Sequence, residues 1–282
     1  MKNTIEKILI IGANGQVGKY LYQINKDAGK DVISTTRKDI DLYQFDVNDL
    51  YRNGIPDVIY LPAAMTNVDY CEINPAESRK VNVDSVIKIV NCIKDSHTKL
   101  VFYSSDYVFD GKEGLYTEDS ATNPINEYGK QKLEAERYIQ NEMMDYLIIR
   151  TSVVYSLSPK SFVGWVIKEL SIGNKINVCT DEWCTPTSAK DLAAYSYCAI
   201  DLKLNGLYHI AGLNATNKYS MARIIAKKNG LDVNLINPIT SKELNRPALR
   251  PLNAGLDCCR FGQDMGYWPS TGYWTYTRDF AI

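Results

Sequence analysis

The opening of the chain, a strand followed by a glycine turn and a helix, constrains the fold more than any other feature. Residues 7–11 (KILII) form an apolar run typical of a buried strand, and residues 19–29 continue as a helix. Between them, Gly12, Gly15 and Gly18 stand at i, i+3 and i+6. The backbone N–H groups of such a turn and the helix N-terminus form a cradle for phosphate. The pattern predicts a dinucleotide-binding fold; a tight turn that only needs backbone freedom is the alternative.

Strand and helix patterns alternate along the rest of the chain. Strands are predicted at 7–12, 31–36, 57–62, 99–105, 145–150 and 206–211, and helices at 16–28, 78–94, 128–142, 161–172, 188–199 and 219–229. In helix 78–94, Val86, Ile89, Val90 and Ile93 share one face, which indicates packing against a sheet. This order predicts an α/β fold, a Rossmann-like, doubly wound parallel sheet with its ligand at the carboxyl ends of the strands.

The regularity of the pattern loosens after residue 155. Segments 156–186 and 213–282 are rich in Trp, Tyr, Asn and Pro, and we expect them to form a smaller substrate-binding lobe. Residues 1–155 and 187–212 would then form the dinucleotide-binding domain. A length of 282 residues suits this division into one nucleotide domain and a small appended lobe.

The composition is that of a globular protein and argues against several classes of partner. Hydrophobic residues make up 45% of the chain, charged residues 23%, and the formal net charge is −1. A nearly neutral chain has no electrostatic reason to bind nucleic acid or an anionic membrane. No stretch approaches the ~20 apolar residues of a membrane helix. The charged start that leads directly into a strand argues against a signal peptide.

The cysteines and histidines indicate the compartment and the absence of a metal centre. Seven cysteines without a CxxC pair predict free thiols and a cytoplasmic protein. Cys92 and Cys198 lie in apolar stretches and are predicted to be core residues. His97 and His209 are the two histidines of the chain, so no metal site is expected and both are predicted to be structural.

A tyrosine and a lysine four residues apart are the candidate catalytic pair. Tyr128 and Lys132 would share one face of the predicted helix 128–142. A neighbouring ammonium favours the phenolate, so we expect Lys132 to lower the pKa of Tyr128 and bring it into range for proton transfer. Ser105, at the end of an apolar strand, could hold a carbonyl oxygen beside the tyrosine. Alone, the pair could be an ordinary surface pair; the upstream nucleotide motif favours catalysis.

The end of the second strand bears on the choice of cofactor. Residues 32–36 are followed by Arg37 and Lys38, at the place where an acidic residue would bind the ribose hydroxyls of NAD. Two cations suit a 2′-phosphate better than a diol, which predicts NADPH. Asp39 and Asp41 follow closely, so NADH stays open as the cofactor, and a solvated charged turn is a further interpretation.

Longer motifs make the chain resemble an extended short-chain dehydrogenase/reductase, and more narrowly the dTDP-4-dehydrorhamnose reductase family. The resemblance runs nearly from end to end. The matching motifs are GANGQVG (12–18), AAMTNVD (63–69), SSDYVFDG (104–111), YGKQKLE (128–134), DEWCTPT (181–187) and RPLNAGL (250–256). SDYVFDG is specific, whereas the glycine motif is shared by many nucleotide-binding enzymes.

The resemblance implies a reaction and a set of residues. The reaction is the NAD(P)H-dependent reduction of the 4-keto group of a nucleotide-linked 6-deoxysugar. Ser105 stands in the family's threonine position, with Tyr128 as the acid and Lys132 as its partner. The implied cofactor residues, besides Tyr128 and Lys132, are Gly12, Gly15, Gln16, Val17, Gly18, Arg37, Asp46, Val47, Ala63, Ala64, Met65 and Thr66. The implied substrate residues are Ser105, Asp106, Val153, Cys184 and Arg250. A homodimer is left open.

Several positions depart from the family pattern, mostly on the sugar side. Val153 stands where the family usually has a tryptophan that stacks on the sugar, and Cys184 stands where it has glycine. Glu182 replaces a usual glutamine, and Leu61-Pro62 replace Asn-Ala beside the cofactor. These changes leave the chemistry in place but predict a sugar that differs in shape from dTDP-4-dehydrorhamnose.

Two other functions are compatible with the sequence. The first is a coupled epimerase and reductase resembling GDP-fucose synthase; that enzyme has a cysteine where this chain has Asp106, so Cys184 would have to act instead. The second is a non-catalytic binding subunit resembling the regulatory subunit of methionine adenosyltransferase. The presence of Tyr128, Lys132 and a hydroxyl at Ser105 argues against a binding module, which needs no proton donor.

Overall fold

A six-stranded parallel sheet forms the centre of the protein. The structure is a computed structural model that describes residues 7–159 and 161–266. In spatial order the strands are β10 (Gly206–His209), β5 (Tyr146–Thr151), β4 (Lys99–Ser105), β3 (Val58–Leu61), β1 (Lys7–Ile11) and β2 (Asp31–Thr35). All six coincide with predicted strands, and the doubly wound α/β fold is confirmed. The strand order reverses between β1 and β3, which is where such sheets bind their ligands.

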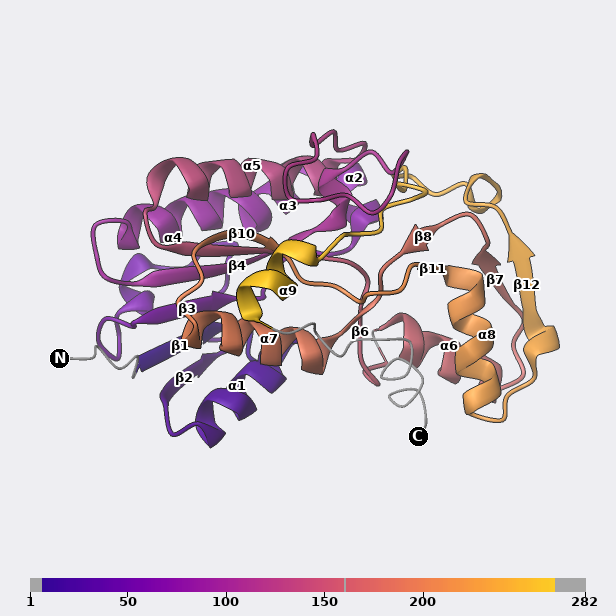
Figure 1. Ribbon diagram of the computed structural model, residues 1–282, viewed down its shortest axis with the longest axis horizontal. Helices are drawn as coiled ribbons and strands as arrows, with labels where there is room; N and C mark the ends of the chain where they lie inside the picture. The colour runs from indigo at the N-terminus through magenta and orange to yellow at the C-terminus, as the bar shows by residue number, and fades with distance from the viewer. Residues whose placement is uncertain (1–6, 160, 267–282) are drawn as a thin grey trace.

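Helices cover both faces of this sheet (Figure 1). Helices α1 (Gly18–Asp27) and α7 (Ala189–Asp201) lie on one face, and α4 (Ser85–Ile93) and α5 (Glu127–Glu142) lie on the other. Successive side chains of β1 point to opposite faces of the sheet, so they pack alternately against the two helix layers. Ile8 and Ile10 join the core under α1 and α7, whereas Leu9 and Ile11 join the core under α4.

The predicted helix 78–94 is interrupted in the structure. It consists of the end of α3 (Pro75–Arg79), a π-helical segment at Lys80–Asp84 and then α4. The four residues predicted to face the sheet are buried there, so the period of the helix was identified correctly. The extra residue that a π-helical turn carries leaves no mark in a hydrophobic period and was therefore missed.

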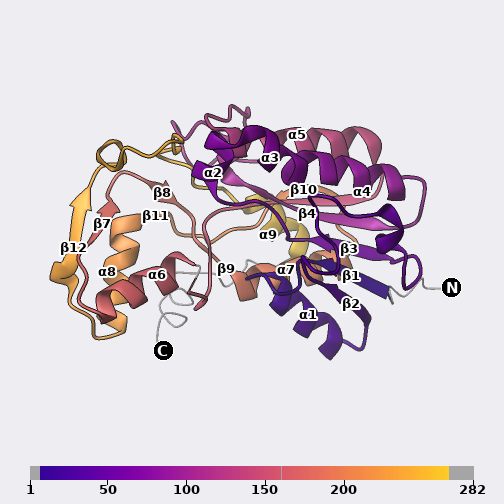
Figure 2. The ribbon, with the colours of Figure 1, turned by 180° about the vertical axis from the view of Figure 1, so that it is seen from behind.

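A smaller lobe lies beyond one end of the sheet (Figures 1 and 2). It contains α6 (Phe162–Ser171), α8 (Lys218–Lys228) and the parallel pair β7 (Ile176–Cys179) and β12 (Ile236–Ile239). Its core is separate from the two cores of the sheet and includes Val166, Ile176, Met221 and Ile225. The division into a nucleotide domain and a lobe remains a prediction, and its residues 267–282 lie outside the described part of the chain.

Short elements connect the lobe to the sheet. The two-residue strands β6 (Val154–Tyr155) and β9 (Thr187–Ser188) pair in parallel, and β8 (Trp183–Cys184) pairs antiparallel with β11 (Thr216–Asn217). Helix α2 (Val68–Ile73) follows β3, and α9 (Cys259–Met265) returns to the sheet. Phe261 of α9 belongs to the core that also contains residues of α1 and α7, so α9 packs on the sheet although it lies within the predicted lobe segment 213–282.

The structure also bears on the predictions about free thiols, buried cysteines and membrane helices. All seven cysteines are free thiols. Cys92 and Cys198 are only half-buried at the edges of the two sheet cores, whereas they were predicted to be core residues. In the described residues, each helix is too short or too polar to cross a membrane.

Candidate active site

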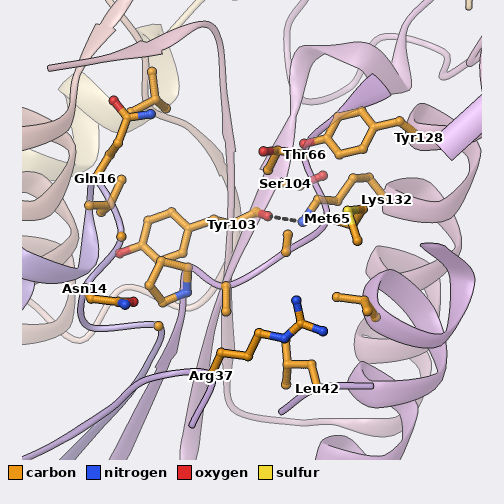
Figure 3. Close-up of a pocket in the computed structure, with 18 of the residues that line it drawn as sticks. Asn14, Gln16, Arg37, Leu42, Met65, Thr66, Tyr103, Ser104, Tyr128 and Lys132 are labelled. Carbon is orange, nitrogen blue, oxygen red and sulfur yellow. Dashed lines mark hydrogen bonds between the residues drawn. The ribbon is translucent and has the colours of Figure 1, made fainter. Parts of the chain in front are cut away.

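A cavity of about 730 Å³ lies at the carboxyl ends of the central strands. Its size falls within the ~300–1,000 Å³ typical of small-molecule and cofactor sites. The cavity brings together segments that are far apart in the sequence, including the glycine turn, the loop after β2, the loop after β3 and the start of α5 (Figure 3). These segments therefore form one site, at the point between β1 and β3 where the strand order of the sheet reverses. Of the predicted cofactor residues, the lining includes Gly12, Gly15, Gln16, Val17, Arg37, Ala63, Ala64, Met65, Thr66, Tyr128 and Lys132.

The glycine turn is set by close packing. Gly12 has a φ of +99°, and a Cβ atom on it would lie 2.8 Å from the Cβ of Ala63. A Cβ atom on Gly18 would lie 2.2 Å from the carbonyl oxygen of Gly12, which no side chain tolerates. Gly18 does not line the cavity but lets α1 start directly behind the turn. The backbone of Gln16 and Val17, which leads into α1, thereby lies in the cavity wall, at the helix N-terminus where phosphate is bound in such folds.

Arg37 stands at the outer rim of the cavity. Its side chain is 78% exposed, and its Nε atom lies 3.3 Å from Asp41 Oδ2. Asp39 does not line the cavity, and its carboxylate accepts hydrogen bonds from the backbone N–H and the hydroxyl of Thr36, both 2.8 Å long. Both carboxylates that left the choice of cofactor open thus have partners within the protein. Asp39 is bonded to Thr36, and Asp41 forms an ion pair with Arg37.

Besides Gly18, two predicted cofactor residues, Asp46 and Val47, do not line the cavity. The Asp46 carboxylate accepts the Asn48 N–H at 2.9 Å and caps the 3₁₀ helix Val47–Leu50. The wall on this side is formed by residues 40–43 instead. They follow β2 and so lie near the switch point, but no sequence motif marks them.

Tyr128 and Lys132 project from the first turns of α5 into the inner wall of the cavity. Asn126 caps this helix by accepting the Gly129 N–H at 2.8 Å. The Lys132 Nζ atom donates to the carbonyl oxygen of Tyr103 at 2.8 Å, across the end of β4 (Figure 3). Burial lowers the pKa of Lys132 to about 8, although the Glu136 carboxylate opposes the shift.

The expected effect of Lys132 on Tyr128 is wrong for this structure. Burial, with a smaller contribution from the Asp106 carboxylate, raises the pKa of the Tyr128 hydroxyl, and the Ser105 hydroxyl opposes the shift. The sequence spacing places the two side chains near each other, but it cannot show that the ammonium is bound to the Tyr103 carbonyl or how deeply the phenol is buried. Tyr128 therefore stays protonated at neutral pH, which is the state a proton donor needs.

Ser105 and Asp106 form a buried hydrogen-bonded group next to Tyr128. The Ser105 hydroxyl donates to Asp106 Oδ1 at 2.9 Å, and the Ser152 hydroxyl donates to Asp106 Oδ2 at 2.6 Å. Burial raises the pKa of Asp106 to about 6 against these two hydrogen bonds. Because the single proton of Ser105 is already donated to Asp106, this hydroxyl must rotate before it can donate to a substrate oxygen.

None of the predicted substrate residues belongs to the lining of the cavity; Ser105 and Asp106 directly follow the lining residue Ser104, and the other three lie farther along the chain. Val153 has a φ of +37°, an uncommon and strained value for a β-branched residue. Cys184 is buried in β8, burial raises its pKa to about 12, and its thiol donates to the carbonyl oxygen of Thr216 at 3.5 Å. Arg250 forms a two-armed ion pair with Asp69, with distances of 3.0 and 2.9 Å. A thiol held in its protonated form weakens the case for epimerisation through Cys184.

Some lining residues were not identified from the sequence. Tyr103 and Ser104 directly precede the predicted Ser105, so their place at the end of a strand could have been used as a signal. Asn14 lies within the glycine turn, between Gly12 and Gly15. Others come from distant segments that only the tertiary fold brings near, namely Thr151, Val154, Ser158 and Leu192. Across residues 7–159 and 161–266, no cluster of metal-ligating side chains is present.

Comparison with known proteins agrees with this geometry. The family described as RmlD substrate binding domain matches residues 6–275. The dTDP-4-dehydrorhamnose reductase of Escherichia coli is 32% identical over 273 residues, which cover 92% of this chain and 91% of that protein. The chain belongs to the dTDP-4-dehydrorhamnose reductase family. This places it among the extended short-chain dehydrogenases/reductases, as its motifs predict.

Solved structures of this reductase family share the whole fold. A dTDP-4-dehydrorhamnose reductase of Clostridium acetobutylicum superposes with a TM-score of 0.90 at 32% identity, covering 97% of each chain. The enzyme of Bacillus anthracis, solved in complex with NADP, also superposes with a TM-score of 0.90, at 26% identity, and covers 98% of this chain and 99% of that one. The family's architecture therefore extends through the smaller lobe as well as the sheet.

Proposed function

We propose that the protein is an NADPH-dependent reductase that converts the 4-keto group of a nucleotide-linked 6-deoxysugar to a hydroxyl. One observation carries the proposal: Tyr128 and Lys132 stand side by side in the wall of a cavity whose opposite wall is the glycine turn. The names of the relatives and the NADP in the Bacillus anthracis structure support the reaction and the cofactor.

The residues would divide the work as follows. The glycine turn and the start of α1 hold the pyrophosphate, and Lys132 contacts the ribose next to the nicotinamide. NADPH, when bound, supplies the hydride. Tyr128 donates the proton from its Oη atom to the sugar's carbonyl oxygen, and Ser105 turns its hydroxyl from Asp106 to the same oxygen. Donors preorganised around a developing alkoxide supply much of the rate in such sites.

A direct test of the function is NADPH oxidation, followed at 340 nm, with a panel of dTDP-, UDP-, CDP- and GDP-linked 4-keto-6-deoxysugars. We expect turnover with at least one of them and a higher kcat/KM for NADPH than for NADH. An enzyme that binds NADPH but turns over none of the panel would contradict the reductase assignment and favour a binding subunit.

The location and assembly of the protein extend this proposal. We place it in the cytoplasm, which the seven free thiols support, because disulfides form in oxidising compartments. A homodimer remains a prediction, and the mass of the protein in solution, measured by light scattering, would test it.

Arg37 tests the choice of cofactor. If its guanidinium contacts the 2′-phosphate, Arg37→Ala should weaken NADPH binding by about 1.5–3 kcal/mol, the worth of a charge-assisted hydrogen bond. The 78% exposure of this side chain favours the lower end of that range. NADH affinity should barely change. Titration of both cofactors measures the difference, and an equal loss for both would show that Arg37 is only a solvated turn residue.

Val153 tests the shape of the sugar pocket. Restoring the family's aromatic surface with Val153→Trp should improve the use of dTDP-4-dehydrorhamnose, relative to the native substrate, by at least ~1 kcal/mol. The positive φ at this position strains any side chain, so tryptophan adds little strain beyond that of valine. The ratio of the two kcat/KM values is the measurement. Efficient wild-type turnover of dTDP-4-dehydrorhamnose without a gain would indicate that another aromatic, such as the half-exposed Trp183, supplies the stacking surface.

A further inference from the structure

The side chain of Gln16, in the glycine turn, is bonded to a serine that lies 140 residues farther along the chain. Gln16 lines the cavity, and the Ser156 hydroxyl donates to its Oε1 atom at 2.7 Å. The same hydroxyl accepts the backbone N–H of Ser158 at 3.2 Å. A hydroxyl carries one proton, and Ser156 gives it to the amide oxygen of Gln16. The amide nitrogen of Gln16 is therefore directed away from Ser156.

This amide nitrogen is turned toward the cavity. Figure 3 shows it on the side of Gln16 that faces Ser104 and Tyr128. Within residues 7–159 and 161–266 it has no hydrogen-bond partner. An amide NH2 group has two protons to donate, so Gln16 offers both of them to a ligand in the cavity. Beside a glycine turn at a helix N-terminus, the ligand groups that need such donors are the oxygens of a diphosphate.

Ser156 itself is fixed by the smaller lobe. It directly follows Tyr155 of β6, which belongs to the core of that lobe. The Ser161 hydroxyl lies 2.5 Å from the Ser156 carbonyl oxygen and 2.8 Å from that of Ser158, and it accepts the Gly164 N–H at the start of α6. A Cβ atom on Gly164 would lie 2.2 Å from the Ser158 carbonyl oxygen, so the helix begins in direct contact with this segment. The smaller lobe thus supplies the group that orients Gln16.

We propose that Ser156 is a positioning residue for the diphosphate of the cofactor: it fixes the amide of Gln16 so that its NH2 group donates to the diphosphate oxygens. The inference rests on the proposed function, because it assumes that this cavity binds NADPH. Without the Ser156 hydroxyl the amide can rotate, and part of the binding free energy is then spent on ordering it. NADPH and NADH share the diphosphate, so both must be affected equally, in contrast to the effect expected at Arg37.

A matched control is available at Ser96, between α4 and β4. Its hydroxyl accepts the backbone N–H of Thr98, two residues on, at 3.1 Å and donates to the Ile93 carbonyl oxygen at 2.7 Å. The hydroxyl of Ser156 likewise accepts from the residue two positions on and donates once. None of Ser96, Thr98 and Ile93 lines the cavity. Ser96→Ala therefore removes a hydroxyl with the same bonding pattern and leaves Gln16 untouched.

The experiment measures the Kd of NADPH and of NADH by fluorescence titration without sugar. We expect Ser156→Ala to raise both Kd values about fivefold and Gln16→Ala to raise both about tenfold. The double variant should match Gln16→Ala, because Ser156 acts through Gln16 and the effects of coupled residues do not add. Ser156→Thr, which keeps the hydroxyl, and Ser96→Ala should both stay within about twofold of wild type.

Kinetics with a 4-keto sugar give a second readout. In Ser156→Ala the KM for NADPH should rise together with Kd, while kcat at saturating NADPH stays within about threefold of wild type, because Tyr128 and Lys132 keep their places. A general loss of folding would instead lower Tm and kcat without this separation of KM from kcat, so Tm is measured for each variant.

Four results would overturn the inference. Unchanged affinity in Ser156→Ala, additive losses in the double variant, or an equal loss in Ser96→Ala would reduce Ser156 to a structural residue. A loss for NADPH alone would place the effect at the 2′-phosphate. If Ser156→Ala does not fold, Ser156→Gly is measured and judged in the same way.

The wild-type titration separates this inference from the proposed function. A wild-type protein that binds neither NADPH nor NADH would overturn the two together. Tight wild-type binding with unaffected Ser156 variants would overturn the inference alone.

Discussion

Tyr128→Phe is expected to lower kcat by ~10²–10⁴ while NADPH affinity stays nearly unchanged, because the substitution removes only the hydroxyl that donates the proton. The ring should keep its place. It packs edge-to-face against Tyr107 with 5.9 Å between the ring centroids, and a phenylalanine ring makes the same contact. The measurement is kcat with a saturating 4-keto sugar, with the Kd of NADPH determined in parallel.

Tyr103→Phe is the control for this experiment. Tyr103 also lines the cavity, but its hydroxyl donates to Oγ of Ser196, a residue of α7, at 2.9 Å. Removing that hydroxyl should cost some stability and little turnover. Near-normal activity of Tyr128→Phe, or an equal loss of activity in the two variants, would exclude Tyr128 as the acid.

Glu136→Ala should lower the free energy of unfolding by about 3–5 kcal/mol, because it leaves the charge of Arg150 buried without its partner. Only 5% of the Arg150 side chain and none of the Glu136 side chain is exposed. The guanidinium donates to Glu136 through Nε at 3.0 Å and through Nη2 at 2.7 Å. Its Nη1 atom already has no hydrogen-bond partner within the described residues, so the site has no spare acceptor to replace the carboxylate.

The exposed pair between Arg79 and Glu134 is the control on the same helix. Its side chains are 42% and 47% exposed, and the closest N–O distance is 2.5 Å. Water can solvate both charges when the pair is broken, so Glu134→Ala should cost at most ~1 kcal/mol. Urea unfolding of both variants measures the difference. Equal losses would mean that the buried pair adds nothing beyond a surface one.

His209 lies close enough to the buried Arg150 guanidinium for that charge to affect its protonation. Its Nδ1 atom lies 3.0 Å from the carbonyl oxygen of Tyr116, and its ring is fully buried beside Phe109. Burial, together with the Arg150 guanidinium, lowers the pKa of His209 to about 3, so the ring is neutral at physiological pH. The prediction that this histidine is structural agrees with these contacts. His97, by contrast, is exposed and lies 3.4 Å from Asp57.

The sequence predicted those helices and strands whose buried residues recur at a regular spacing along the chain. The run at residues 7–11 and the helical period of Val86, Ile89, Val90 and Ile93 each bury one regular face, and regular burial leaves a regular pattern. The pairs β6–β9 and β8–β11 have two residues per strand, too few for an alternation. They form because distant segments meet, and no local signal marks such a meeting.

The residues of the candidate site were likewise predictable only where a local motif marks them. Gly12, Tyr128 and Lys132 stand in motifs whose chemistry follows from residue type and spacing, so they were identified from the sequence. The pKa of Tyr128 depends on how deeply its hydroxyl is buried. The hydrogen bond of Ser105 depends on the neighbouring Asp106, which also accepts from Ser152 at the end of the adjacent strand β5. Burial and hydrogen-bond partners are properties of the assembled fold, which the spacing of residues does not contain.

The glycine turn and Arg37 would respond very differently to mutation over evolutionary time. A side chain at Gly12 or Gly18 collides with the backbone or with Ala63, so these two positions can hardly vary without loss of the fold. Arg37 is mostly solvated, and surface substitutions of this kind usually change stability by less than ~0.5 kcal/mol. If Arg37 sets the preference for NADPH, that preference can drift or be redesigned by single substitutions at almost no structural cost, while the phosphate cradle itself stays invariant.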